Sequence, residues 1–310
     1  MTTTLVTAGD KRFFWGLFLL VASVRKHGMD NPIKCLVKGL SDQEEAALAQ
    51  FDVTVCRSED IERPLQAQKP TALLLGLEDS DYATWIDGDC VVEGNISELL
   101  LPNSPNEVMI RFRDRVENKL RFQTQDEDGG IPASIQKTWR EDVGEADYCN
   151  IETTCVTNAF TLHKSHKDLI HHWDTQIQHV ASKHAGHFPE AYSHSSGKGI
   201  SDELILNSLF GYSKANYQFT PYLLAEEADR CLLHFGLNPK PWEMWIHSTL
   251  QYYKLVFSIL DWAQEKGYDM PARPLALISA YKPIAFSWAV GYEFARKTAR
   301  GLRSRLRSGR

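Results

Sequence analysis

Two aspartates separated by one glycine are the residues in this 310-residue chain with the clearest chemical potential. Asp87, Gly88 and Asp89 directly follow an apolar run at 82–86. In an extended chain, residues two apart point to the same side, so both carboxylates can reach one divalent cation. Gly88 lets backbone or ligand approach closely, and hard oxygen ligands suit Mg²⁺ or Mn²⁺. Because Asp-Gly is also common in turns, a plain turn between two strands is the alternative interpretation.

The elements that must position these carboxylates alternate along the first half of the chain. Strands are expected at Thr3–Ala8, Ile33–Lys38, Asp52–Cys56 and Tyr82–Ile86, and helices at Lys11–His27, Ser41–Gln50 and 65–77. This alternation is typical of an α/β fold with a Rossmann-like, mainly parallel sheet and flanking helices. Ligands bind such sheets at the carboxyl ends of the strands. Asp10 and Asp87 both fall at such ends, which predicts a site at that edge.

The second half is less regular. Residues 123–147 are polar and glycine-containing, which predicts a surface loop that could serve as a lid. A strand is expected at Val156–Leu162, a helix at Lys167–His184, and a loop at 185–200. From Trp245 onward the chain is expected to be helical. We therefore expect an α/β domain at 1–244 and a helical C-terminal extension at 245–310.

Three stretches, in order along residues 2–243, resemble the motifs of glycosyltransferase family 8. The stretch Tyr82–Leu100 resembles that family's DxD region, in which an apolar strand runs into two aspartates. His234–Trp242 is similar to its HxxGxxKPW motif, although the glycine stands one place early. Ser201–Asn207 resembles its DQDxLN motif, with Glu203 in place of glutamine. The resemblance implies a GT-A fold and a retaining, Mn²⁺-dependent enzyme that uses a UDP-sugar.

What the resemblance implies for single residues is chemically reasonable. Asp87, Asp89 and His234 would hold the metal, Mn²⁺ or alternatively Mg²⁺. Charge that develops on a diphosphate leaving group must be neutralised by a metal and a cation, and Lys240, between two prolines, would supply the cation. The residues expected to bind the UDP-sugar are Thr7, Ala8, Gly9, Asp10, Lys69, Asp87, Gly88, Asn158, Gly236 and Lys240. A solvated lysine at 69 and an ordinary strand-to-helix turn at 7–10 are the alternatives.

Asp202 and Glu203 are the candidate catalytic residues. The resemblance places them beside the anomeric carbon of the donor sugar. A carboxylate there could stabilise an oxocarbenium-like transition state or attack it to form a covalent glycosyl-enzyme. The alternative is a structural role, because Ser201 and Asp202 would cap a following apolar helix well.

The expected function is therefore transfer of a hexose from a UDP-sugar to a hydroxyl of a glycan or a lipid-linked saccharide. A sugar-nucleotide pyrophosphorylase or nucleotidyltransferase is one rival, although the segment 7–10 is a poor match to a glycine-rich, basic phosphate loop. A non-catalytic glycan-binding module is the other, and the intact set of Asp87, Asp89, His234 and Lys240 argues against it.

Charge is unevenly distributed along the chain. The formal net charge is -6, but the last 15 residues carry seven basic and no acidic side chains. An acidic body does not suggest nucleic-acid binding. The basic tail with aromatic residues upstream predicts peripheral attachment to an anionic membrane surface, at the cytoplasmic face. A disordered solubilising end or a nucleic-acid-binding tail is the alternative.

Cysteine usage points to a reducing compartment. The six cysteines include no CxxC pair and are expected to be free thiols of a reducing cytoplasm. The apolar run Phe13–Val24 is expected to be a buried first helix rather than a signal peptide. Eight of the 11 histidines lie between His163 and His194 without metal-ligand spacing, and structural roles are expected for them. Of these, His187 and His194 could touch an acceptor.

Overall fold

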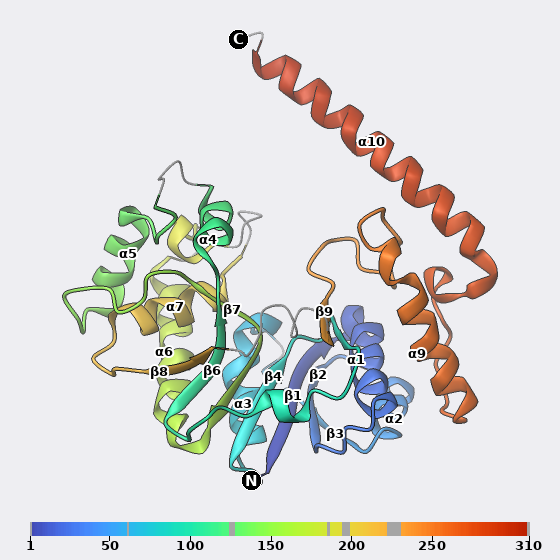
Figure 1. The fold of residues 1–310 in the computed structure, drawn as a ribbon, viewed down its shortest axis with the longest axis horizontal. Coiled ribbons are helices and arrows are strands. Elements are labelled where there is room, and N and C mark those ends of the chain that lie inside the picture. The colour runs from blue at the N-terminus through green and yellow to red at the C-terminus, as the bar shows by residue number, and fades with distance from the viewer. Residues whose placement is uncertain are drawn as a thin grey trace.

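The computed structural model of the protein describes residues 2–60, 62–123, 128–184, 187–193, 199–221 and 231–308. A seven-stranded sheet with the order β3-β2-β1-β4-β7-β6-β8 forms its centre (Figure 1). Its strands are β1 Thr3–Asp10, β2 Ile33–Lys38, β3 Val53–Arg57, β4 Tyr82–Ile86, β6 Glu107–Phe112, β7 Cys155–His163 and β8 Gln218–Pro221. Neighbouring strands are parallel except where β7 runs against β4 and β6. The predicted α/β, mainly parallel fold class is confirmed.

Helices cover both faces of this sheet. The described helices are α1 Phe14–Lys26, α2 Asp42–Ala49, α3 Lys69–Gly76, α4 Arg115–Phe122, α5 Ala133–Val143, α6 Lys167–Lys183, α7 Asp202–Tyr212, α9 Tyr253–Glu265 and α10 Lys282–Ser308. Successive strand residues face opposite sides, so Leu5 of β1 packs in the core under α1 while Val6 packs in the core under α3. Two hydrophobic cores thus hold the carboxyl edge of the sheet in place.

Local sequence signals explain where the first elements begin and end. Ser41 and Glu44 form a reciprocal capping box at the start of α2. Gly28 ends the first helix with a φ of 69°, a conformation that glycine adopts without strain. The first turn, Lys11–Phe13, is a 3-10 helix whose free amides bond to Asp10. The six cysteines are all free, as predicted.

The prediction of a loop at 123–147 is wrong over much of that range. Ala133–Val143 forms α5, and residues 124–127 lie outside the described residues. Ile135 and Trp139 stand four residues apart, so one face of this mainly polar helix is buried. Trp139 is fully buried and donates its indole N–H to Ala191 O at 2.9 Å. Two apolar residues were too few for the sequence to show a helical period.

The C-terminal segment divides into a packed part and a projecting part. Helix α9 packs on α1, and residues as far as Leu277 belong to the same hydrophobic core as β1. The predicted boundary between 244 and 245 stays a prediction. Helix α10 then extends away from the body (Figure 1). Among the described helices, none is both long enough and apolar enough to cross a bilayer.

Candidate functional site

A two-stranded ribbon beyond the carboxyl edge of the sheet brings the two strongest motifs together. Strand β5, Cys90–Val92, follows the second aspartate, and strand β9, Leu232–His234, ends at the candidate histidine. The two strands pair antiparallel, with Cys90 opposite His234. The Phe235 amide extends the pairing by donating to Asp89 O at 2.9 Å. Pairing of segments far apart in the sequence is therefore what assembles the site.

Asp87 has one carboxylate oxygen held by the body of the protein and the other turned toward His234. Its Oδ1 accepts from Trp85 Nε1 at 2.7 Å and lies 3.0 Å from Lys69 Nζ. Its Oδ2 lies 3.9 Å from His234 Nε2. The Asp87 amide also donates to Asn158 O at 2.8 Å, which fixes the turn against β7.

Asp89 is arranged in the same way. Its Oδ2 forms a 2.6 Å ion pair with Lys240 Nζ, and its Oδ1 lies 3.2 Å from His234 Nε2. Burial alone would raise the pKa of Asp89, but His234 and Lys240 outweigh it and lower that pKa to about 2. Burial opposes charge on His234 as well, yet the hydrogen bond and charge of Asp89 leave the pKa of the imidazole raised.

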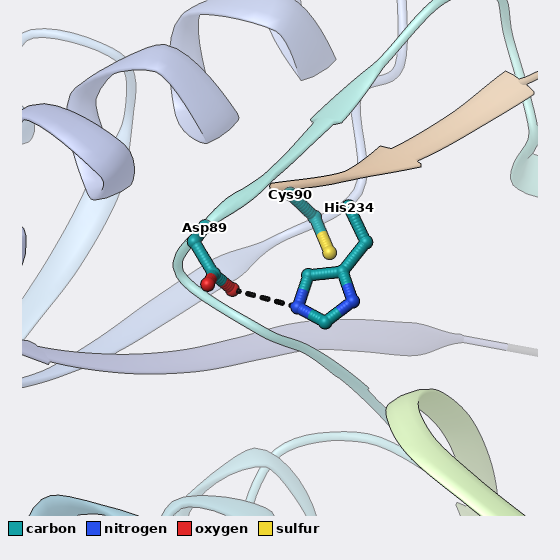
Figure 2. Close-up of side chains that lie close together, drawn as sticks. All are labelled: Asp89, Cys90 and His234. Atoms are coloured by element: carbon teal, nitrogen blue, oxygen red, sulfur yellow. Dashed lines mark ion pairs between the residues drawn. The ribbon is translucent and has the colours of Figure 1, made fainter. Parts of the chain in front are cut away.

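In each aspartate, therefore, one carboxylate oxygen contacts a lysine and the other faces Nε2 of His234. The two carboxylate oxygens of this donor set fit Mn²⁺ or Mg²⁺, which prefer hard oxygen ligands, and the imidazole nitrogen favours the transition metal Mn²⁺. Within the described residues, candidate ligand atoms of Asp89, Cys90 and His234 all lie within 4.8 Å of one another (Figure 2). Asp87 stands just outside that group, and small rotations about its side chain would bring Oδ2 closer to the other two donors.

Lys240 is immobilised by its surroundings. The ammonium also donates to Phe235 O at 2.6 Å, and only 6% of the residue is exposed. Glu243 accepts from the Lys240 amide and from Arg12 Nε, while Trp242 Nε1 donates to Arg12 O. The Lys-Pro-Trp turn is thereby bound to the beginning of the first helix, which holds the ammonium beside Asp89.

Close backbone packing explains the glycines of the site. A Cβ on Gly88 would lie 2.9 Å from Leu17 and 3.0 Å from Ala8 O. A Cβ on Gly16 would lie 2.4 Å from Gly88 O, so the aspartate turn sits directly on α1. A Cβ on Gly236 would approach the His234 ring to 3.3 Å. The glycine at 236, one place early relative to the motif, gives room to the imidazole.

Lys69 connects the aspartate turn to the candidate catalytic residues. Its ammonium lies 2.9 Å from Asp202 Oδ2, 3.0 Å from Asp87 Oδ1 and 3.0 Å from Thr157 O. The residue is 5% exposed, so the solvated-lysine alternative is wrong. Burial opposes its charge, but Asp202 and Asp87 raise the pKa of Lys69 further above its usual value. Burial raises the pKa of Asp202 despite the opposing effect of Lys69.

Glu203 has different partners. Its Oε1 accepts from Arg113 Nη2 at 2.8 Å and its Oε2 from the Thr157 amide at 3.3 Å, and Arg121 lies 3.8 Å away. Within the described residues, no ion pair joins Glu203 to the Asp89 and His234 group. Both oxygens of Glu203 thus tie α7 to β6 and β7. Ser201 caps α7, as the alternative structural interpretation of this segment expects.

The remaining predicted donor-binding residues lie at the same edge. Thr7, Ala8 and Gly9 end β1, with Thr7 and Ala8 buried and Gly9 packed against Leu17. Asp10 accepts from the Arg12 and Phe13 amides at 2.9 and 3.2 Å, so its carboxylate caps the following turn. Asn158 is half-buried on β7, next to the aspartate turn. His187 is exposed, and His194 lies outside the described residues.

Several residues of the site were not anticipated. Trp85, Thr157 and Arg113 position Asp87, Lys69 and Glu203, and Cys90 adds a thiol beside the candidate metal ligands. Cys90 carried a signal that was available, because it directly follows Asp89. The others contribute through hydrogen bonds and ion pairs between distant segments, and a single sequence does not reveal these.

Comparisons with known proteins identify the fold. No family model matches the chain, and no curated protein matches it. The apo structure of the bifunctional glycosyltransferase WbbM aligns with a TM-score of 0.58 and 15% identity, covering 85% of this chain and 51% of WbbM. The galactosyltransferase LgtC, in complex with donor and acceptor sugar analogues, aligns at 0.52 and 13% identity, covering 86% and 100%. An active-site mutant of LgtC aligns at 0.51 and 13% identity, covering 83% and 95%.

The chain thus spans about half the length of WbbM and the whole of LgtC. At these identities the likeness establishes the fold. The GT-A fold expected from the motif resemblance is confirmed, and the chain has the architecture of these glycosyltransferases.

Proposed function

We propose that the protein transfers a hexose from a UDP-sugar to a hydroxyl of a glycan or lipid-linked saccharide, with retention and with Mn²⁺. One arrangement carries this proposal. Asp87 and Asp89 each have one oxygen on a lysine and the other facing His234, at the carboxyl edge of a glycosyltransferase fold. Ligand sites of open α/β sheets lie at this edge.

The proposed leaving group is the UDP diphosphate. Asp87 Oδ2, Asp89 Oδ1 and His234 Nε2 would hold Mn²⁺, or Mg²⁺, which would supply positive charge to the diphosphate as its bond to the sugar breaks. Lys240, held beside Asp89, would add a second positive charge next to the phosphates. Because the residue is already buried and held by the Lys-Pro-Trp turn, little side-chain entropy remains to be lost on donor binding.

The nucleoside and the sugar would extend to either side of the metal. Thr7, Ala8, Gly9 and Asp10 offer a small, closely packed strand end to the uridine. Asn158 lies toward the sugar side, on the strand that accepts the Asp87 amide. Gly236 is exposed and leaves its backbone accessible to the donor, whereas Gly88 is buried and lets the aspartate turn pack on α1.

Asp202 is the stronger candidate beside the anomeric carbon. Lys69 links it directly to the metal-binding Asp87, whereas the two oxygens of Glu203 are engaged by Arg113 and Thr157. We propose that the carboxylate of Asp202, held in place by Lys69, stabilises positive charge at the sugar, and that Glu203 positions α7. This assignment disfavours Glu203 as a covalent nucleophile.

The proposed location is the cytoplasmic face of a membrane. Ile284 and Trp288 are exposed on α10 four residues apart, which puts them on one side of the helix, and Tyr281 is exposed just before the helix begins. Phe286, Val290 and Phe294 are exposed as well. With the basic tail beside them, these residues suit the interface of an anionic bilayer, which would bring the site near a lipid-linked acceptor.

Isothermal calorimetry tests the core of the proposal. UDP should bind in Mn²⁺ and lose most of its affinity in excess chelator, and UDP-hexoses should be hydrolysed slowly when no acceptor is present. Titrating UDP-Glc, UDP-Gal, UDP-GlcNAc and UDP-GalNAc would identify the donor. The pyrophosphorylase alternative predicts instead that a sugar 1-phosphate and UTP are consumed with release of pyrophosphate.

A further inference from the structure

A cysteine thiol lies among the candidate metal ligands, and no step of the proposed reaction uses it. Cys90 begins β5 and stands directly opposite His234, so the two side chains share one face of the ribbon. Figure 2 shows the Cys90 thiol turned toward the His234 ring, with Asp89 on the other side of the ring nitrogen. We propose that Asp89, Cys90 and His234 form a site for a thiophilic divalent cation, of which Zn²⁺ is the representative.

The donor atoms suit such a cation in kind and in spacing. Zn²⁺ binds thiolate sulfur at about 2.3 Å and imidazole nitrogen or carboxylate oxygen at about 2.0–2.2 Å, in tetrahedral geometry. Neighbouring ligand atoms in that geometry are roughly 3.3–3.6 Å apart. Asp89 Oδ1 and His234 Nε2 are already 3.2 Å apart. The Cys90 thiol, a carboxylate oxygen of Asp89 and a ring nitrogen of His234 all lie within 4.8 Å of one another. A modest movement of Cys90 completes three ligands, and water or Asp87 supplies the fourth.

Coordination by the Cys90 thiol would distinguish Zn²⁺ binding at this site from Mn²⁺ binding. When Zn²⁺ binds, a zinc–sulfur bond forms and the thiol proton passes to solvent. Mn²⁺ and Mg²⁺, which prefer oxygen and nitrogen, gain much less from that exchange.

The two modes of binding exclude one another. Both need Asp89 Oδ1 and His234 Nε2, so one cation at a time can occupy them. Zn²⁺ would thus displace the activating cation and prevent UDP binding, which makes the site sensitive to thiophilic ions. This competition, unlike Zn²⁺ binding itself, rests on the proposed function.

Cobalt substitution tests the ligand set directly. Co²⁺ bound by a thiolate shows an intense near-ultraviolet charge-transfer band. We expect this band in the wild-type protein and in the control Cys56→Ser, a half-buried cysteine on β3. The band should be absent from Cys90→Ser and Cys90→Ala. Zn²⁺ affinity should fall in both Cys90 variants by at least the 10- to 100-fold expected for loss of an outer-shell partner, and Mn²⁺ affinity should fall far less.

A wild-type Co²⁺ complex without the band, or a band that survives in folded Cys90 variants, would overturn the proposal. Circular dichroism establishes folding. If both variants unfold, the ¹¹³Cd NMR shift of the wild-type protein decides, because a thiolate ligand moves the signal strongly downfield and its absence rejects the site. Mn²⁺-dependent UDP binding in the same samples tests the proposed function separately, since that function can hold with or without a thiolate ligand.

Discussion

Lys69 and Asp202 form a buried ion pair, with Nζ 2.9 Å from Oδ2, although they are far apart in the sequence. The same ammonium lies 3.0 Å from Asp87. One lysine therefore balances a carboxylate beside the proposed metal and a carboxylate beside the proposed sugar. Lys69 at the start of α3 and Asp202 at the start of α7 thus connect the proposed metal side of the candidate site to the proposed sugar side.

Removing this lysine should be costly for the fold. We expect Lys69→Met to lower the free energy of unfolding by about 3–5 kcal/mol, because it leaves a buried carboxyl without its cation. The double variant Lys69→Met/Asp202→Asn should recover part of that loss, since the uncompensated charge is then absent. Urea denaturation measures both.

The exposed pair Lys164 and Asp81 provides the matched control for Lys69. Their ammonium and carboxylate are 2.8 Å apart, but the side chains are 55% and 41% exposed. Lys164→Met should therefore cost less than about 1 kcal/mol. Equal losses from Lys69→Met and Lys164→Met would contradict the importance assigned to the buried pair.

Metal dependence should depend on Asp89. In Asp89→Asn the amide oxygen can still accept from Lys240, so the variant should fold, but the negative charge that attracts the cation is gone. Calorimetry should show UDP binding to this variant at the weak level that the wild-type protein has in chelator. Asp81→Asn, an exposed aspartate remote from the ribbon, should bind like wild type. Wild-type UDP affinity that is the same with chelator and with Mn²⁺ would end the metal hypothesis.

The regular part of the fold was predictable because its signals are local. The bounds of β2 and β4 follow from short apolar runs between turn residues, and α2 begins at a capping box that the sequence displays. Helix α5 was missed because two buried residues, Ile135 and Trp139, carry its contact with the core. Among polar neighbours, so few apolar residues leave no clear period.

The residues of the candidate site could be proposed from the sequence, but the ion pairs and hydrogen bonds that connect them could not. Asp87, Asp89, His234 and Lys240 were identified by type and motif, and the β5–β9 ribbon does bring Asp89, His234 and Lys240 together. The engagement of Glu203 by Arg113, and of Lys69 by two aspartates, depends on how three separate segments pack. No local pattern specifies such ion pairs.

Asp202 and Glu203 should respond differently to loss of charge. We expect Asp202→Asn to lower kcat by about 100-fold or more, as is common when a charge that stabilises the transition state is removed. Glu203→Gln keeps one oxygen acceptor and places an NH2 group opposite the other of the two donors, Arg113 and the Thr157 amide, so kcat should change little while stability falls by about 1–3 kcal/mol. Paired donor hydrolysis assays and urea denaturation separate the two. A larger kcat loss in Glu203→Gln than in Asp202→Asn would instead support Glu203 as the nucleophile.

The contact between the first helix and the aspartate turn should tolerate no added methyl group. In Gly16→Ala the Cβ would meet Gly88 O at 2.4 Å, and overpacking of this kind costs about 1–3 kcal/mol. The same change at Gly291 in α10 meets no atom within 4 Å and should gain about 0.5–1 kcal/mol from helix propensity. Thermal unfolding compares the two, and Gly16→Ala should also weaken Mn²⁺-dependent UDP binding. Equal stability of the two variants would refute the close contact.

The C-terminal helix should carry the membrane affinity, and its charge and apolar surface can be separated. Each basic residue near an anionic leaflet contributes about 1 kcal/mol, so the seven in the last 15 residues could attach the chain reversibly. The full chain should sediment with phosphatidylserine vesicles, less at high salt, whereas a chain that ends at Glu293 should stay in solution and still hydrolyse donor. Replacing the exposed Ile284 and Trp288 by serine should weaken binding without changing its dependence on salt, because those side chains contribute burial rather than charge. Equal sedimentation of the full and shortened chains would show that the basic run is not the anchor.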